Sequence, residues 1–330
     1  MFGLGPSPFI LGGTLNVHLE KCSQNHPICV RELKDGAYVD DINIASDTVE
    51  ETREIKEDAV KILGEGGFML HKWHSNAAKL ESHVKEDGET TYAKESLGTT
   101  PSETKLLGLG WNKSEDTLSV TFPPNENEVT KRIVLRTMAK IYDPLGLAAP
   151  ILLTAKVIFR DICDSKLGWD ADLPEELKGR WEKWLKNLPV QLKMPRAIPR
   201  EIGVIVELIL NGFADASILG CCAVIYAVIK QAGVISQGFL ISKTRLAKRD
   251  LTIPRLELVS FHMLSNLLHN TFKVLSHIRI ASQGRYKQFV AHRVEKINEK
   301  EEIVWKYVPS KENPADIGSR GSSDLETNEM

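Results

Sequence analysis

Three apolar runs, separated by short turns, most strongly limit how this chain can fold. They extend from Ile202 to Phe213, from Cys221 to Ile229 and from Val234 to Ser242. Runs of this kind predict neighbouring strands. Apolar residues then recur at helical spacing between Pro254 and Asn270, and a last strand is expected over Ile303 to Val308. This order of elements predicts a layered domain in which helices cover a sheet.

The preceding residues, from about 113 to 200, carry mainly helical patterns. Pro150 precedes a broad apolar run from Ile151 to Cys163, and Pro174 precedes a second helical pattern. Because proline is favoured in the first turn of a helix, a helix is expected after each of these prolines. The apolar side of the second helix is formed by Leu177, Trp181, Trp184, Leu185 and Leu188. We expect both tryptophans to lie in the core.

A third helix is expected near the start of the chain. Asp47 and Glu50 have the spacing of a capping box, and apolar residues follow at helical spacing until a group of glycines ends the pattern after residue 63. Residues 68–73 are expected to form a strand. Residues 75–105 are polar and show little periodicity, so they are expected to form surface loop with irregular strands.

The length of 330 residues suggests two or three domains. The changes in pattern divide the chain into residues 1–112, 113–200 and 201–321, followed by a disordered tail at 322–330. The expected fold class is therefore mixed, α+β or α/β.

Five cysteines are unevenly placed along the chain and predict no disulfide framework. The vicinal pair Cys221-Cys222 is expected to place its side chains on opposite faces of a strand. No apolar run approaches the ~18–20 residues of a membrane span, and no secretion signal is recognised. We therefore expect no membrane partner and an intracellular location, cytoplasmic or nuclear.

The formal charge of −2 is unevenly distributed. Residues 243–296 contain eleven Lys or Arg and three acids, a balance of +8, so the rest of the chain carries −10. Such a region could follow a phosphate backbone, but a solvated basic face explains the same counts.

Two adjacent carboxylates are expected on a hairpin. Residues 37–44 place short apolar runs on both sides of Asp40 and Asp41, which predicts a tight turn that holds both acids. Like charges at this distance repel, and divalent cations bound through oxygen are a common means of offsetting that repulsion. A chance pair of acids in a turn is the alternative.

Several motifs in order resemble the reverse transcriptases of Pao/BEL-class retrotransposons. Tyr38-Val39-Asp40-Asp41 resembles their polymerase signature, and Gly5-Pro6-Ser7-Pro8-Phe9 is similar to the motif that opens their nucleotide-contacting helix. The pattern continues through three further runs: Gly66 to Phe68 with Leu70 to Asn76, Lys105 to Trp111, and Ala139 to Leu147. The resemblance covers roughly residues 1–321.

This resemblance implies a partial reverse-transcriptase palm at 1–112, a helical thumb or connection at 113–200, and an RNase H-like mixed sheet with flanking helices at 201–321. Asp40 and Asp41 would hold magnesium ions, and Ser7 and Lys72 would contact nucleic acid. The family's palm carries a third aspartate on a strand before the Ser7 motif, where this chain begins. We therefore expect the palm to be truncated and nucleotide addition to be absent.

The same resemblance implies nuclease acids in the last domain. Asp215 follows a strand, Glu257 lies on a helix, and Asp316 lies in Asn313-Pro314-Ala315-Asp316. RNase H chemistry needs about four carboxylates around two Mg²⁺ ions, although each of these residues alone could be a surface acid or a helix cap. No Asp or Glu occurs from Leu258 to Val294, where the third acid is expected. We infer an internal deletion near residue 270 and weakened hydrolysis.

The chain is therefore interpreted as a fragment of a retrotransposon pol polyprotein, with an ancestral RNA-directed DNA polymerase and ribonuclease H activity. Its expected partner is an RNA–DNA hybrid or another nucleic acid, and the candidates for phosphate contact are Lys243, Arg245, Lys248 and Arg249. The alternative is a non-catalytic nucleic-acid-binding or interaction module left from the element. The sequence does not indicate the oligomeric state.

The corresponding family region is also known as the Pao retrotransposon peptidase. Aspartic peptidases present their carboxylate in Asp-Thr-Gly or Asp-Ser-Gly, and neither tripeptide occurs in this chain. The sequence therefore does not support proteolysis.

Overall fold

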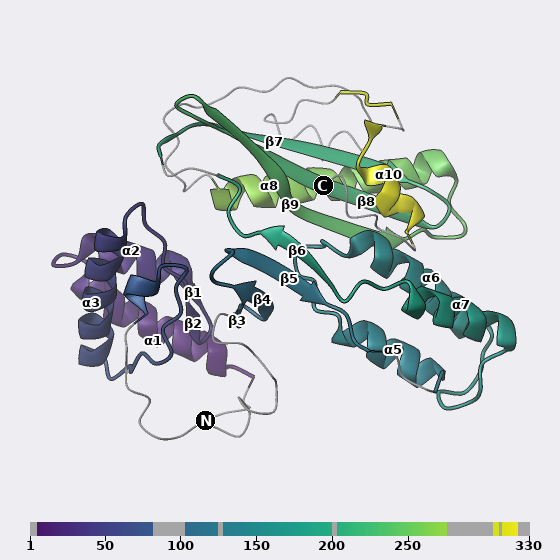
Figure 1. The fold of residues 1–330 in the computed structure, drawn as a ribbon, viewed down its shortest axis with the longest axis horizontal. Helices are drawn as coiled ribbons and strands as arrows, with labels where there is room; N and C mark the ends of the chain where they lie inside the picture. Colours follow the sequence, from purple (N-terminus) through teal and green to yellow (C-terminus); the bar gives the residue numbers. More distant parts are fainter. Residues whose placement is uncertain are drawn as a thin grey trace. The chain divides into compact units, whose positions relative to one another are not determined.

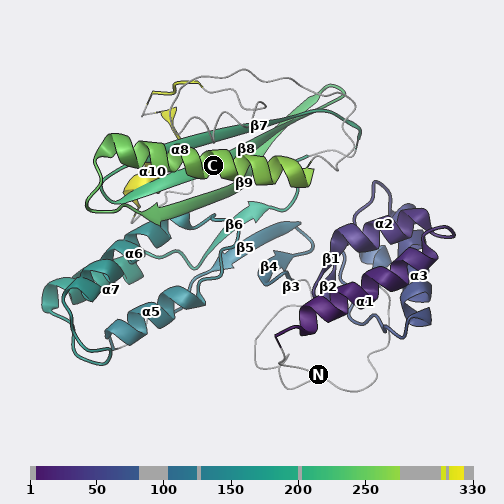
Figure 2. The same ribbon diagram turned by 180° about the vertical axis from the view of Figure 1, so that it is seen from behind.

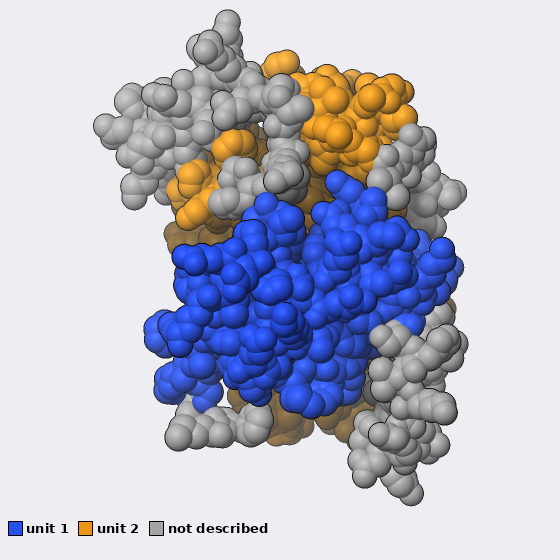
Figure 3. All heavy atoms as spheres, turned by 90° about the vertical axis from the view of Figure 1, so that its left-hand side faces the viewer, with its two compact units in different colours: residues 1–107, 111–116 blue, residues 108–110, 117–330 orange. Residues whose placement is uncertain are grey.

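The chain is mixed α+β, with helices and antiparallel sheets. The computed structural model describes residues 5–81, 103–124, 128–199, 203–275, 306–309 and 312–322. Figures 1 and 2 show the elements from opposite sides, and Figure 3 colours two compact units. Unit 1 comprises residues 1–107 and 111–116, and unit 2 comprises residues 108–110 and 117–330.

Unit 1 is built around three helices, α1 (Ser7–Cys22), α2 (Pro27–Gly36) and α3 (Val49–Glu65). Pro8 and Pro27 occupy the first turns of α1 and α2, where proline costs no helical hydrogen bond. The three helices share a core formed by Leu15, Leu19, Cys29, Val30, Leu33, Ile55, Ala59, Ile62 and Leu63.

The capping residue of α3 differs from the one predicted. Thr48 is the N-cap, and its side chain accepts a hydrogen bond from the backbone N–H of Glu51 at 3.1 Å. The prediction of an Asp47–Glu50 box was therefore wrong by one residue, because Thr48 lies three residues before Glu51 and fits the same capping pattern.

Residues 68–73 do not form the strand that the sequence predicts. The backbone N–H of Phe68 donates to the carbonyl of Leu63 at 2.8 Å, so the chain folds back on the end of α3. Phe68 and Leu70 pack against the helical core. Burial against helices therefore replaces strand pairing here.

Residues 113–200 are less purely helical than expected. Strands β5 (Thr117–Thr121) and β6 (Gln191–Pro195) pair antiparallel, from Thr117 opposite Pro195 to Thr121 opposite Gln191. Strands β3 (Glu103–Leu106) and β4 (Leu109–Asn112) precede β5 in the chain. These strands are too short for a pattern of period two to stand out from the neighbouring helical sequence.

Three helices follow β5, namely α5 (Lys131–Lys140), α6 (Ala149–Asp164) and α7 (Glu175–Lys186). Pro150 lies in the first turn of α6, as predicted, and Pro174 is the N-cap of α7. The rings of Trp181 and Trp184 stack with centroids 4.6 Å apart and are buried, which confirms their core position.

The sheet predicted after residue 201 contains β7 (Ile205–Ala216), β8 (Gly220–Gln231) and β9 (Val234–Leu246), all antiparallel with β8 in the middle. Its register places Asp215 opposite Cys222, and Cys222 opposite Thr244. Residues 306–309 form no strand, and the rest of the strand predicted at 303–308 lies outside the described residues.

Helices cover both faces of this sheet. Helix α8 (Ile253–Leu275) packs on the face that contains Cys221, whereas α10 (Ala315–Arg320) packs on the face that contains Cys222 (Figures 1 and 2). The vicinal cysteines therefore lie on opposite faces, as predicted. No described helix is long and apolar enough to span a membrane.

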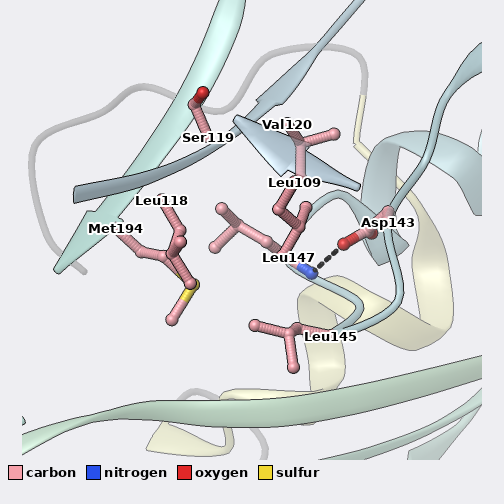
Figure 4. A pocket seen from close by; sticks show the side chains of 8 residues that line it. All are labelled: Leu109, Leu118, Ser119, Val120, Asp143, Leu145, Leu147 and Met194. Carbon is pink, nitrogen blue, oxygen red and sulfur yellow. Dashed lines mark hydrogen bonds between the residues drawn. The ribbon is translucent and has the colours of Figure 1, made fainter. Parts of the chain in front are cut away.

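The family-like run around Asp143 forms a structural junction. Its carboxylate accepts hydrogen bonds from the backbone N–H groups of Leu147 and Ala148, both at 2.8 Å, just before α6 begins. Figure 4 shows the bond from Leu147. Burial raises the pKa of Asp143, while these bonds act in the opposite direction. The adjacent apolar pocket is too narrow to hold a water molecule and is part of the packed interior.

Gly146 allows this junction to approach β9 closely. Its φ is +79°, and an added Cβ would lie 2.2 Å from the carbonyl oxygen of Ser242. The N–H of Ser242 also donates to the carbonyl of Leu145 at 2.8 Å, and its hydroxyl donates to the carbonyl of Gly146 at 2.6 Å.

We predict that Gly146→Ala lowers the free energy of unfolding by at least about 2 kcal/mol, because it adds a backbone clash to left-handed strain. Gly233→Ala is the matched control, since Gly233 has φ of +83° but open space around it. That variant should lose about 1 kcal/mol. Denaturant unfolding measures both values, and equal losses would contradict a close approach at Gly146.

Candidate functional site

Asp215 lies near the end of β7, on the face covered by α10. Its cross-strand neighbour Cys222 belongs to the apolar cluster that includes Ala315 of α10. Directly opposed residues on a sheet project to the same face, so the register places the Asp215 side chain towards α10. The hydroxyl of Ser319 donates to Asp215 Oδ2 at 2.5 Å.

Two further side-chain hydrogen bonds connect the Asp215 strand to the α10 segment. The side-chain amide of Asn313 donates to the carbonyl of Ala214 at 3.1 Å, and the hydroxyl of Ser217 donates to the carbonyl of Ser319 at 2.6 Å. We call Ser217, Asn313 and Ser319 the clamp residues. They hold the segment that contains Asp316 against the segment that contains Asp215.

Close packing complements the clamp residues. A Cβ on Gly318 would lie 2.2 Å from Cys222 Sγ, so only glycine lets α10 approach β8 this closely. At the end of α10, Gly321 has φ of +75° and lies against Thr154 of α6. Helix α10 is therefore packed against both the sheet and α6.

Asp316 lies at the start of α10 and is partly buried. Its Oδ1 lies 2.7 Å from Nη2 of Arg320, one helical turn later. The contact is an ion pair by distance, but it lacks the alignment of a hydrogen bond. Because the Arg320 side chain is largely exposed, this pair contributes little to stability.

Glu257 lies on the opposite side of the sheet from the clamp residues. It follows Leu256, whose carbonyl accepts a hydrogen bond from the thiol of Cys221 at 3.5 Å on the α8 face. Glu257 itself is exposed. The structure therefore brings the Asp215 and Asp316 segments together, and places Glu257 on the other layer.

The carboxylates do not assemble into a metal centre within the part of the chain that the structure describes. There, no three His, Cys, Asp or Glu side chains lie close enough together to hold a metal ion. A two-metal site needs several converging carboxylates. The described residues thus do not fit a complete Mg²⁺ site.

In unit 1, the predicted hairpin forms from β1 (Ala37–Tyr38) and β2 (Asp41–Ile42). Asp40 lies in its turn after Val39, which has φ of +55°, and Asp41 begins β2. Both carboxylates are exposed. Among the candidate nucleic-acid contacts, Ser7 begins α1, and Lys72 is exposed with φ of +58°.

The four basic candidates lie on β9 and in the turn that follows it, and all are exposed. Lys243 and Arg245 lie opposite Ala223 and Cys221, which places them on the α8 face. Arg249 forms ion pairs with Asp161, at 3.1 Å, and with Asp164 of α6. The Arg249 guanidinium therefore links the turn after β9 to helix α6. The basic residues between positions 276 and 296 lie outside the described residues.

Sequence reasoning did not identify the clamp residues as part of the site. A local signal was present, because Ser217 lies two residues after Asp215, and Asn313 and Ser319 lie three residues on either side of Asp316. Such residues near an acid usually cap turns. Their contacts with the other segment depend on the tertiary structure.

The antiparallel sheet with α8 on one face and α10 on the other is an RNase H-like arrangement with flanking helices. Residues 130–287, just under half of the chain, match the family model described as Pao retrotransposon-like RNaseH-like domain. This match supports the resemblance of that region to Pao retrotransposons. The matched residues extend across position 200, where the sequence predicts a domain boundary. No curated protein and no solved structure matches the chain.

We predict that Ser319→Ala lowers the free energy of unfolding by about 1–3 kcal/mol, because the buried hydroxyl bonds a carboxylate across two segments. Ser260→Ala is the control. Ser260 is equally buried, but its hydroxyl bonds only the Glu257 carbonyl within α8, at 2.7 Å. Its loss should stay within about 0.5 kcal/mol of wild type. Urea unfolding compares the two, and similar values would argue against the clamp.

The cysteines should react with iodoacetamide in a defined order. Burial raises the pKa of Cys29 to about 11 and that of Cys222 to about 12, and it also raises the pKa of Cys221. Because the thiolate reacts, Cys29 and Cys222 should be alkylated at pH 8 at least on the order of 100-fold more slowly than ordinary thiols, and Cys221 should also react more slowly. Partly buried Cys22 and Cys163 should be labelled first by mass spectrometry. Early labelling of Cys222 in the native protein would contradict this packing.

Proposed function

We propose that the chain is a fragment of a retrotransposon-derived pol polyprotein whose RNase H-like unit binds nucleic acid and cleaves RNA–DNA hybrids weakly or not at all. The match of residues 130–287 to the Pao family model is the observation that carries this proposal. The clamped Asp215 and Asp316 segments support it, because they join two of the proposed nuclease acids at one end of the sheet.

Nucleic-acid binding follows from the kind of domain and from the charge on its surface. Lys243, Arg245 and Lys248 are exposed and have no acid between them in sequence. Cations in such a row suit a phosphate backbone, and the resulting affinity depends on salt. Arg249 is a weaker candidate, because it is already paired with Asp161 and Asp164.

Weak hydrolysis follows from the carboxylates. We assign Asp215, Glu257 and Asp316 to the ancestral nuclease site, for which Mg²⁺ would be the cofactor. The third acid of the family has no counterpart between Leu258 and Val294, and the described acids form no metal-binding group. With a ligand missing, paired cations are poorly held for phosphodiester cleavage.

Residues 1–112 are proposed to derive from a reverse-transcriptase palm in which Asp40 and Asp41 held polymerase metals. The acids before them in sequence, Glu20, Glu32 and Asp35, lie on α1 and α2 rather than on a strand beside the hairpin. We therefore propose that this chain performs no templated DNA synthesis, which a primer-extension assay would test.

Binding and cleavage of a labelled RNA–DNA hybrid test the proposed function. We expect salt-dependent binding by fluorescence anisotropy, little turnover with Mg²⁺, and unchanged binding by Asp215→Asn. Asp250→Asn, which removes an exposed acid of the same unit, is the matched control.

Each possible outcome has a distinct meaning. Robust Mg²⁺-dependent cleavage that Asp215→Asn abolishes and Asp250→Asn retains would refute the loss of catalysis. Binding without turnover supports a non-catalytic module retained from the element. Absence of binding to hybrid and to single strands would refute the function itself.

A further inference from the structure

Helix α1 of unit 1, purple in Figures 1 and 2, is apolar on two sides. The inner side, with Leu15 and Leu19, is buried in the helical core. On the outer side Phe9, Ile10 and Val17 are 84%, 56% and 60% exposed. A helix that is apolar all round is normally buried all round, so the outer side of α1 is open where its sequence predicts a cover.

The outer side carries a stripe that is complementary to itself. Phe9, Gly13 and Val17 follow one another at intervals of four residues, so they are neighbours along one side of the helix. A Cβ added to Gly13 would meet no atom within 4 Å, so the middle of the stripe is an open gap between two larger apolar side chains. The order of large, small and large residues is the same in both directions. Such a surface can pack against a second copy of itself around a two-fold axis.

The spacing of the stripe fixes how two copies would meet. When two antiparallel α1 helices cross at Gly13, Phe9 of each copy lies beside Val17 of the other, because both residues are four positions from the crossing point. Glycine at that point allows the helix axes to come closer than the ~8–10 Å of ordinary helix packing. The contact then covers the most exposed side chain of α1, an aromatic residue of the type that anchors protein interfaces.

The charges on α1 favour the antiparallel arrangement. No Lys, Arg, Asp or Glu occurs between Gly5 and Leu19, so the stripe can lose water without burying a charge. Glu20, which pairs with Lys34 at 2.5 Å, and Lys21 are the first charged residues. A parallel pair would place the two Lys21 ammonium groups side by side, where like charges repel. An antiparallel pair places each of them near the uncharged start of the other helix.

We propose that the outer side of α1 is a homodimer contact in which two copies of the chain pack antiparallel across Gly13. The inference goes beyond the proposed function and does not depend on nucleic-acid binding. Each copy contributes one helix to the contact, and interfaces that bury less than about 1,200 Å² are generally transient. The association is therefore expected to be reversible and to depend on protein concentration.

Two other occupants fit the stripe less well. A nucleic-acid backbone binds through cations, and the stripe contains none. A helix that lies on a membrane combines its apolar face with a charged face rich in Lys and Arg. The inner side of α1 is instead apolar and packed in the core, through Leu15 and Leu19. An uncharged, self-complementary apolar surface suits a second copy of the chain.

The first test introduces a charge into the stripe and measures dimerisation by sedimentation velocity. Val17→Glu alters the stripe, and Val60→Glu is the matched control, since Val60 is a 48% exposed valine on α3 of the same unit. Wild type should shift from monomer towards dimer as the concentration rises to about 200 µM, as expected for a small interface. Val17→Glu should raise the dissociation constant at least about tenfold, because its carboxylate would face Phe9 in the contact. Val60→Glu should behave as wild type.

The second test adds one methyl group at the crossing point. Gly13→Ala alters the stripe, and Gly12→Ala is the control, one residue away and therefore on a different side of the helix. Both glycines have open space around them, and alanine is favoured over glycine inside a helix, so each variant should fold. Gly13→Ala should raise the dissociation constant at least about threefold, because its methyl group holds the two helices apart. Gly12→Ala should leave the constant unchanged.

The outcomes separate this inference from the proposed function. A wild type that stays monomeric throughout the concentration series, or dimerisation that each stripe variant and its control affect equally, would overturn the contact while nucleic-acid binding stands. Binding of the monomer to phosphatidylserine vesicles that Val17→Glu abolishes would overturn it in favour of a membrane surface. If circular dichroism shows that Val17→Glu is unfolded, the comparison of Gly13→Ala with Gly12→Ala decides. Equal dissociation constants for those two variants would reject the crossing at Gly13.

Discussion

Strand β8 is buried on both faces, and unit 2 depends on this double burial. Cys221, Ala223 and Ile225 project into the α8 layer, while Cys222 and Val224 project towards α10. Alternation along a strand sends successive side chains to opposite faces, so a strand with an unbroken apolar run, such as Cys221 to Ile225 in β8, needs a cover on each side. Helix α8 provides one cover. The α10 segment, with α6 beside it, provides the other, and this requirement holds the end of the described chain against the sheet.

The candidate site is a consequence of that second cover. Because α10 must approach β8 within the space left by Gly318, the residues around Asp316 meet the residues around Asp215, and polar groups buried in the contact require partners. Ser319 and Asn313 provide them. The same interactions that complete the core thus bring two carboxylate-bearing segments together. They do not reach Glu257, which belongs to the α8 layer.

The family match and the charge distribution of unit 2 both bear on nucleic-acid binding. Residues 130–287 resemble a Pao retrotransposon-like RNaseH-like domain, and this region begins with the basic helix α5 and includes the basic end of β9. Binding of nucleic acid needs only a surface of suitable charge, whereas hydrolysis needs every metal ligand in place. A fragment that loses a ligand can therefore lose turnover and retain binding.

The sequence by itself determined the elements whose pattern is long and regular, such as the strands of the β7-β8-β9 sheet, helix α8 and the opposite faces of Cys221 and Cys222. It also indicated Asp215 and Asp316 through motifs, because motif residues lie close together in the chain. Only the tertiary structure decided that Ser319 bonds Asp215, that Arg249 is paired with α6, and that residues 68–73 pack on helices instead of forming a strand. Each of these contacts joins residues that are separated in sequence or depends on a neighbouring element, and local propensity carries no information about such partners.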